Sequence, residues 1–263
     1  MPLHRRLGAT TVSALDDGGG PYFRPRRDAF PQATDEQWRR ADELDPNARS
    51  VEGEWLLRFR CFAVRAADGT LTLVDTGIGP AGAPASSWAP TPGQLPTELT
   101  RAGVDPDQVT TVVLTHLHTD HIGWAVVGEP YFANATYVLQ RAEYEAIDEL
   151  NPALRQALIV PLEAAEQLRL VDGDVQLNVA TRIVATPGHT PGHQSVLVAD
   201  GDAAVLITGD LLVHAIQLVD PELAYLYESD PDTARASRIA MLRGGLVLAT
   251  SHLGEAFGYS GMW

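Results

Sequence analysis

Length, composition and charge exclude several classes of protein before any motif is considered. The chain has 263 residues, 45% hydrophobic and 20% charged, which suits one packed domain, and its one cysteine excludes an internal disulfide. The formal net charge of −15 disfavours a nucleic-acid partner, because such binding depends on Lys and Arg that neutralise phosphates. No apolar run reaches the roughly 18 to 20 residues that span a bilayer, and no hydrophobic leader follows the first residues. We therefore expect a cytoplasmic protein without membrane contacts.

The hydrophobic residues of the first 50 positions show little periodic spacing, and the segment contains the run Gly18-Gly19-Gly20 and several prolines. We expect residues 1–50 to form an irregular arm with a short helix at 35–44. The aromatic residues of this arm favour packing on the body of the chain, residues 51–263, over a free tail. A role in lining a pocket or supporting a dimer stays open.

From Trp55 onward the pattern predicts alternating strands and helices. The turn Asp68-Gly69 predicts a hairpin of strands 55–66 and 70–75. Apolar residues at helical spacing from Leu95 predict a helix of about ten residues, which a strand at 111–115 follows. The later elements are expected as a helix at 140–150, strands at 168–171, 175–178, 182–186, 195–199 and 203–208, a helix from 231 to about 243, and an apolar strand at 246–249.

The segment His116-Leu117-His118-Thr119-Asp120-His121 directly follows the apolar run at 112–114. Neutral imidazole and carboxylate are ligands for Zn, Fe, Ni or Mn, and an ordinary surface loop has no physical reason to concentrate them. The segment therefore predicts a metal site.

Three later segments also place histidines at or near the ends of expected strands. These are Gly-His-Thr-Pro-Gly-His at 188–193, Thr-Gly-Asp-Leu-Leu-Val-His at 208–214, and Thr-Ser-His at 250–252. Loops at the ends of buried strands carry the chemistry of many α/β folds. Four separate strand ends are therefore expected to meet at one pocket.

In their order and spacing, these motifs resemble the metallo-β-lactamase superfamily from about Trp55 to His252. The resemblance implies an α/β fold, a four-layer αββα sandwich with metals in the cleft between its halves. It implies two divalent ions, one bound by three histidines, one bound by two histidines and an aspartate, and a second aspartate that bridges both. In that order the implied ligands are His116, His118 and His189; Asp120, His121 and His252; and Asp210. The resemblance also implies supporting rather than ligand roles for His193 and Asp75.

The activity implied by the resemblance is hydrolysis of a small molecule by a metal-bridging hydroxide. Two nearby divalent ions can lower the pKa of a shared water toward neutrality. Zn²⁺ is the first expectation, with Fe, Mn or a mixed pair left open. Asp120 is expected to pass a proton to the leaving group, and His214 to face the substrate or to be structural. A homodimer is a further expectation by resemblance.

Within the superfamily, the chain is most similar to methyl parathion hydrolase-like and lactonase-like members, which implies opening of a lactone or cleavage of an ester-type bond. A phosphotriester hydrolase is an alternative, and so is an iron-dependent redox enzyme similar to persulfide dioxygenases. The complete set of seven ligand positions favours the hydrolase. One departure concerns Val213, which stands where the best-known lactonases carry a tyrosine. Trp88, Trp124, Phe132 and the N-terminal aromatics are candidate walls of the pocket.

Overall fold

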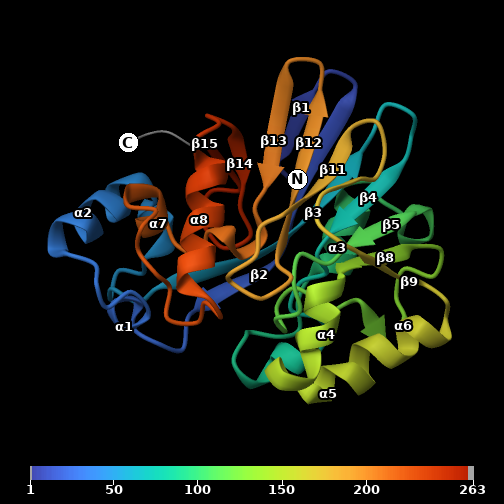
Figure 1. Cartoon of the computed structure of the whole chain (residues 1–263), viewed down its shortest axis with the longest axis horizontal. Coiled ribbons are helices and arrows are strands. Elements are labelled where there is room, and N and C mark those ends of the chain that lie inside the picture. Colours follow the sequence, from blue (N-terminus) through green and yellow to red (C-terminus); the bar gives the residue numbers. More distant parts are fainter. Residues whose placement is uncertain (1, 260–263) are drawn as a thin grey trace.

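The computed structural model describes residues 2–259, and its centre is a pair of β-sheets (Figure 1). The first sheet has the strand order β1-β2-β3-β4-β5-β8-β9, in which β4, β5, β8 and β9 run parallel. Its strands are β1 His4–Leu7, β2 Thr10–Pro21, β3 Leu56–Arg65, β4 Leu71–Val74, β5 Thr111–Val113, β8 Thr136–Gln140 and β9 Leu168–Val171.

The second sheet has the order β10-β11-β12-β13-β14-β15, and only its β13–β14 pair is parallel. Its strands are β10 Val175–Gln176, β11 Thr181–Ala185, β12 Gln194–Asp200, β13 Ala203–Ile207, β14 Val247–Ala249 and β15 Phe257–Tyr259. A separate small ribbon pairs β6 Val126–Val127 with β7 Glu129–Pro130.

Helices lie on the outer sides of both sheets, with α4, α5 and α6 beside the first and α8 beside the second (Figure 1). The α-helices are α1 Arg26–Ala29, α2 Asp35–Leu44, α3 Leu95–Arg101, α4 Arg141–Leu150, α5 Pro152–Leu154, α6 Val160–Ala164, α7 Ile216–Val219 and α8 Pro231–Leu242. Short 3-10 turns occupy Pro46–Ala48, Pro84–Ser87, Pro106–Gln108 and Gly209–Leu211, and one π-turn occupies Arg155–Ile159. None of the helices in residues 2–259 combines the length and apolarity needed to cross a bilayer.

Successive side chains of a strand point to opposite faces of its sheet, which explains why four layers form. In β4, Leu73 packs toward the helices of the first layer, while its neighbour Val74 packs between the two sheets. In β13, Val205 and Ile207 face the same space between the sheets, and Leu206 faces the layer that contains α8. Because both faces of these strands are buried, they consist of continuous apolar runs. The expected α/β fold, a four-layer αββα sandwich, is confirmed.

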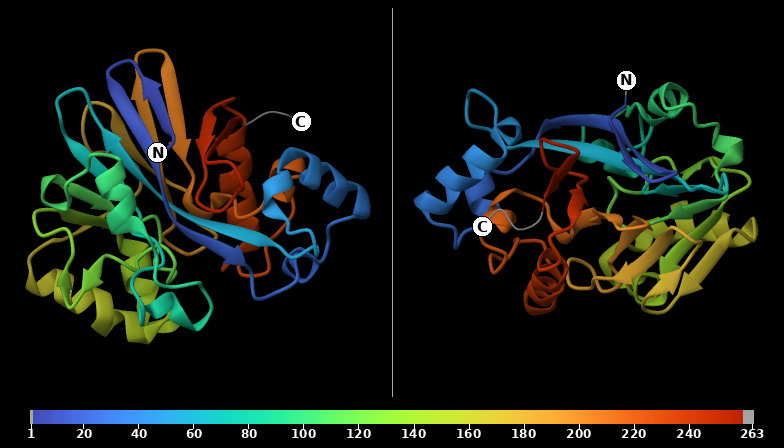
Figure 2. Two further views of the ribbon diagram at one scale, coloured as in Figure 1. Left: turned by 180° about the vertical axis from the view of Figure 1, so that it is seen from behind. Right: turned by 90° about the horizontal axis from the view of Figure 1, so that it is seen from above.

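Most expected elements are observed, including the hairpin of β3 and β4 and helices α2, α4 and α8. The expectation of an irregular start is wrong for residues 4–21, which form β1 and β2. β2 pairs antiparallel with β3 along nearly its whole length, and the register shifts between Asp16 and Gly18. Helix α2 lies beside α7, although the two helices are far apart in the sequence (Figure 2). The division of the chain at residue 50 stays a prediction.

Candidate metal centre

The four histidine-containing segments come together at one end of the two sheets. One follows β5, one joins β11 to β12, one follows β13, and one follows β14. Their side chains form two groups, and within each group the potential ligand atoms lie within 4.8 Å of one another. The groups are His116, His118, His189 and Asp210, and Asp120, His121 and His252. The structure therefore brings together all seven side chains that the sequence proposed as ligands.

Asp210 belongs to the first group, and its carboxylate also contacts the second. Its Oδ2 lies 3.2 Å from Nε2 of His189, and its Oδ1 lies 2.9 Å from Nε2 of His252 and 3.1 Å from Nε2 of His121. Asp120 Oδ2 lies 3.5 Å from the same nitrogens of His121 and His252. This is the arrangement that a carboxylate shared by two cations requires.

Partners behind the ligands determine which imidazole nitrogen faces the centre. Nδ1 of His252 is 2.7 Å from the Arg58 carbonyl oxygen, to which it can only donate. Nδ1 of His121 is 2.8 Å from Asp75 Oδ2. The Nε2 atoms of these two rings lie 3.2 Å apart with their lone pairs facing the centre. Two facing lone pairs repel each other unless a positive charge lies between them.

His116 is oriented by a short relay. The Thr115 hydroxyl donates to Asp75 Oδ2 at 2.8 Å and therefore accepts from Nδ1 of His116, 3.1 Å away. The Thr115 backbone N–H also donates to Asp75, at 2.7 Å. Asp75 thus supports two ligand histidines without lying in either ligand group, which agrees with its expected orienting role.

Unpartnered buried atoms show that the site fits a cation. Within the described residues, His116 Nε2 and Asp210 Oδ1 have no hydrogen-bond partner. When His121 and His252 are neutral, as in metal binding, their protons lie on Nδ1 and the nearest neighbours of Asp210 Oδ1 are two further acceptors. Buried acceptors without donors are unfavourable, and a divalent cation would satisfy them together.

The electrostatics of the site favour positive charge. Burial lowers the pKa of His118 to about 3 and also lowers that of His116, so both rings are neutral and ready to bind metal. For His121 and His252, burial acts in the same direction, but Asp210 and Asp120 outweigh it and raise the pKa of both rings. Burial would raise the pKa of Asp210, but His252 and His121 hold it well below its usual value. In the chain alone, protons supply the positive charge that bound cations would supply.

His193 lies behind the centre, as expected for a supporting residue. Its Nδ1 donates to the Thr186 carbonyl oxygen at 3.0 Å, and its Nε2 accepts the backbone N–H of Asp210 at 3.0 Å. Glu143 on α4 has a similar role that the sequence did not indicate. Its carboxylate accepts backbone N–H groups of Leu117 and Gly192, each at 2.9 Å, and so joins two ligand loops. A lone Glu in a helix gives no signal of this kind.

His214 does not line the cavity, so the expectation that it faces the substrate is wrong and the structural alternative agrees with its position. The side chain is buried, and its ring centroid lies 5.2 Å from those of Trp38 and Trp55 and 5.9 Å from that of Phe30. Its Nδ1 accepts the backbone N–H of Ile216 at 3.0 Å. The chain turns after Asp210, so the His214 ring packs inside an aromatic cluster.

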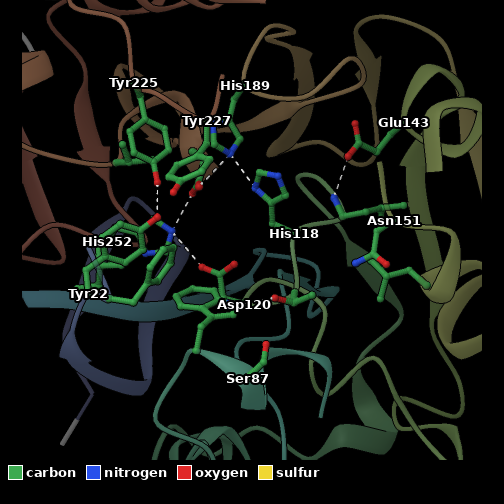
Figure 3. A pocket seen from close by; sticks show the side chains of 18 of the residues that line it. Tyr22, Ser87, His118, Asp120, Glu143, Asn151, His189, Tyr225, Tyr227 and His252 are labelled. Carbon is green, nitrogen blue, oxygen red and sulfur yellow. Dashed lines mark hydrogen bonds and ion pairs between the residues drawn. The ribbon is translucent and has the colours of Figure 1, made fainter. Parts of the chain in front are cut away.

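A cavity of about 500 Å³ opens onto the two ligand groups (Figure 3). His118, Asp120, His189, Asp210 and His252 lie at its base. Aromatic and aliphatic side chains form most of the remaining wall, among them Tyr22, Phe23, Trp55, Trp88, Tyr225, Tyr227, Leu117, Ile147 and Leu154.

The expected wall residues divide between the cavity and the core. Trp88, Tyr22 and Phe23 line the cavity, as expected. Phe30 and Trp38 are buried in the aromatic cluster around His214, so the expectation is wrong for them. Phe132 is wholly buried in the core beneath the first sheet, so the expectation for it is wrong. Trp124 packs against the same core and donates from its indole nitrogen to Asp17 at 3.1 Å.

Comparisons with known proteins agree with this architecture. Among curated proteins, the chain is 34% identical over 113 residues to an N-acyl homoserine lactonase of a Bacillus species, covering 43% of this chain and 42% of that protein. It is 32% identical over 154 residues to the N-acyl homoserine lactonase AttM of Agrobacterium fabrum, covering 53% and 55%. The alignments thus span about half the length of these relatives.

Solved structures share the fold over nearly the whole chain. The hydrolase AbOPH of the beta-lactamase superfamily superposes with a TM-score of 0.80 at 23% identity, covering 100% of this chain and 97% of its own. AidC, a dizinc quorum-quenching lactonase, gives 0.78 at 22% identity, covering 98% and 92%. The family model for the metallo-beta-lactamase superfamily matches residues 60–252, which is more than half of the sequence. The chain therefore belongs to the metallo-beta-lactamase superfamily.

Proposed function

We propose that this chain is a dinuclear metal-dependent hydrolase that opens lactones, with N-acyl homoserine lactones as the first candidate substrates, and cleaves related ester bonds. The observation that carries the proposal is the position of Asp210, whose carboxylate reaches both histidine groups at the base of an apolar cavity. The similarity to N-acyl homoserine lactonases supports the choice of lactone, and it favours hydrolysis over iron-dependent redox chemistry.

Each ligand has a separate part in this proposal. His116, His118 and His189 would hold one ion, His121, His252 and Asp120 would hold the other, and Asp210 would hold both. When bound, two such ions supply hydroxide near neutral pH and polarise the substrate carbonyl. Asp120 lines the cavity, so one of its oxygens can carry a proton to the leaving alkoxide.

The cavity wall agrees with a neutral substrate that has an apolar tail. Beyond the ligands, its lining is mainly aromatic and aliphatic, and an acyl chain would bury apolar surface against it. Zn²⁺ as the resident metal, a cytoplasmic location and a homodimer stay predictions. The dizinc neighbour AidC supports the choice of zinc.

The test measures metal content and hydrolysis together. The purified chain is loaded with zinc and assayed on N-hexanoyl homoserine lactone, γ-butyrolactone, an aryl ester and a phosphotriester. We expect about two ions per chain and turnover of the lactone. His116→Ala removes a buried ligand and is expected to lose at least one ion and about 100-fold or more in kcat. His4→Ala, an exposed histidine outside the site, is the matched control and should match the wild type.

Three outcomes would contradict the proposal. The first is a chain that holds fewer than two ions after loading. The second is a loaded chain that hydrolyses none of the four substrates. The third is bound iron with oxygen uptake and no hydrolysis, which would support the redox alternative.

A further inference from the structure

Two tyrosines that are far apart in sequence meet at the cavity wall beside the ligand groups (Figure 3). Tyr22 directly follows β2, and Tyr225 lies in the loop between α7 and α8. Their hydroxyl oxygens are 2.8 Å apart, which is a hydrogen bond. No motif contains either residue, and the proposed function above does not use them.

Both rings are held in place by aromatic contacts. The Tyr22 ring packs edge-on against Trp55 at 4.7 Å between centroids. The Tyr225 ring stacks on the ligand candidate His189, with centroids 6.1 Å apart and an interplanar angle of 14°. The hydroxyl pair therefore has a fixed position relative to the centre.

The hydroxyl groups of Tyr22 and Tyr225 carry one more proton than the hydrogen bond between them uses. Two hydroxyl groups carry two protons, and one bond between them uses one proton. Within the described residues, the two hydroxyls bond only to each other. Tyr225 is 7% exposed and lies deeper than Tyr22, which is partly exposed. The geometry allows either hydroxyl to donate in this bond. Because Tyr225 is the more buried of the two, we assign it as the donor, which leaves the Tyr22 O–H free to donate into the cavity.

The charges around the pair keep both phenols protonated. Burial raises the pKa of Tyr22 and of Tyr225, and the carboxylates of Asp120 and Asp210 act in the same direction. These carboxylates influence the phenols because the hydroxyl pair is close to the centre. A neutral phenol is a hydrogen-bond donor throughout the pH range in which such hydrolases work.

We propose that the Tyr22 hydroxyl, positioned by Tyr225, donates a hydrogen bond to the carbonyl oxygen of the scissile lactone or ester. The inference rests on the proposed function. Hydroxide adds to the carbonyl carbon, and the C=O π pair moves onto the oxygen. The hydrogen bond from Tyr22 then strengthens as that oxygen becomes negative. When the adduct collapses, the C=O bond re-forms and the bond from carbon to the leaving oxygen breaks. The added hydroxyl group gives its proton to Asp120, which passes it to the leaving oxygen, so the products are a carboxylate and an alcohol.

The test compares three tyrosine-to-phenylalanine variants of the zinc-loaded chain. Tyr22→Phe removes the donor, Tyr225→Phe removes its positioning partner, and Tyr131→Phe removes a hydroxyl from a partly buried tyrosine that packs against Trp124 and does not line the cavity. With N-hexanoyl homoserine lactone we expect kcat to fall about 30- to 100-fold for Tyr22→Phe and about 5- to 10-fold for Tyr225→Phe. KM should change less than about threefold, because the interaction strengthens in the transition state. Tyr131→Phe should stay within about twofold of the wild type.

A second readout does not depend on turnover. Hexylphosphonate presents a tetrahedral anion in place of the adduct, and calorimetry gives its affinity for each loaded variant. We expect Tyr22→Phe to bind it about tenfold more weakly than the wild type and Tyr131→Phe, with unchanged zinc content and Tm.

The outcomes separate this inference from the proposed function. If the wild type hydrolyses the lactone but Tyr22→Phe matches Tyr131→Phe in kcat and in phosphonate affinity, the tyrosine proposal is overturned and the hydrolase proposal stands. Loss of zinc from Tyr22→Phe would also overturn it, because the role would then be structural. If the wild type hydrolyses no lactone, the proposed function fails, and the phosphonate affinities decide whether the pair binds a tetrahedral anion.

Discussion

Acid should reduce the difference in stability between the wild-type chain and a His214→Asn variant. His214 is 1% exposed, and its ring lies against Trp38 and Trp55. Burial, with a smaller effect of Arg26, lowers the pKa of His214 to about 3. Asn keeps an oxygen that can accept the N–H of Ile216, but it has no group that titrates in this range.

The sign of the effect follows from the two pKa values. In the unfolded chain a histidine has a pKa near about 6.5, well above the folded value. The stabilisation from the buried neutral ring is therefore complete above pH 6.5 and is lost as the pH falls toward 3, because the unfolded chain takes up a proton that the folded chain does not. Each pH unit in this range is worth about 1.4 kcal/mol, so the loss between about pH 6.5 and 4.5 is about 3 kcal/mol.

Urea unfolding of the metal-free wild type and variant, at pH 7 and at about pH 4.5, measures this loss. The other histidines titrate in both proteins, so their effect cancels in the difference. The variant should be less stable at pH 7, because Asn fills less of the aromatic cluster, and the gap should shrink by about 3 kcal/mol at the lower pH. A gap that stays constant or widens would refute a buried neutral ring. With zinc bound at pH 8, kcat should stay within about twofold of the wild type, since His214 does not line the cavity.

Two other substitutions test the support behind the centre. Asp75→Asn replaces the carboxylate that orients His121 and Thr115, and zinc affinity measured by chelator competition should fall about 10- to 100-fold in a folded protein. Wild-type affinity would contradict the relay. Asp17→Ala removes a buried acceptor of the backbone N–H groups of Ile78, at 2.6 Å, and Leu95, at 2.5 Å, so urea unfolding should show a loss of about 2–6 kcal/mol. Asp202→Ala, which changes an exposed aspartate in the turn between β12 and β13, serves as the control, and equal losses for the two variants would argue against this role for Asp17.

The sequence predicted the sheets and the meeting of the ligand candidates for physical reasons. Buried strands such as β5 and β13 are continuous apolar runs, and ligand-rich loops directly follow them. Parallel strands end at the same edge of a sheet, which explains why the loops after β13 and β14 lie close together. The loop after β5 belongs to the other sheet and reaches them because the two sheets are stacked. Residue chemistry then selected side chains that the structure places within reach of shared cations.

Long-range pairing accounts for the expectations that were wrong. Residues 18–20 are all glycine, which disfavours a strand locally, yet they continue β2 because Gly18–Gly20 pair with Leu57–Phe59 of β3. Tyr225 and Glu143 each contribute to the cavity through one residue with no neighbouring pattern. Such residues become visible only when the fold brings them together.

The orientation of each imidazole is a further property that the sequence could not give. A histidine offers two nitrogens, and the one that binds a cation is the one left free when the other has a partner. Here those partners come from different strand ends: Asp75 follows β4 and serves His121, and the Arg58 carbonyl on β3 serves His252. Residue identity explains which side chains gather, but only the sheet explains why both Nε2 lone pairs face Asp210. A mutation on β3 or β4 that shifts either partner should therefore weaken metal binding without touching a ligand.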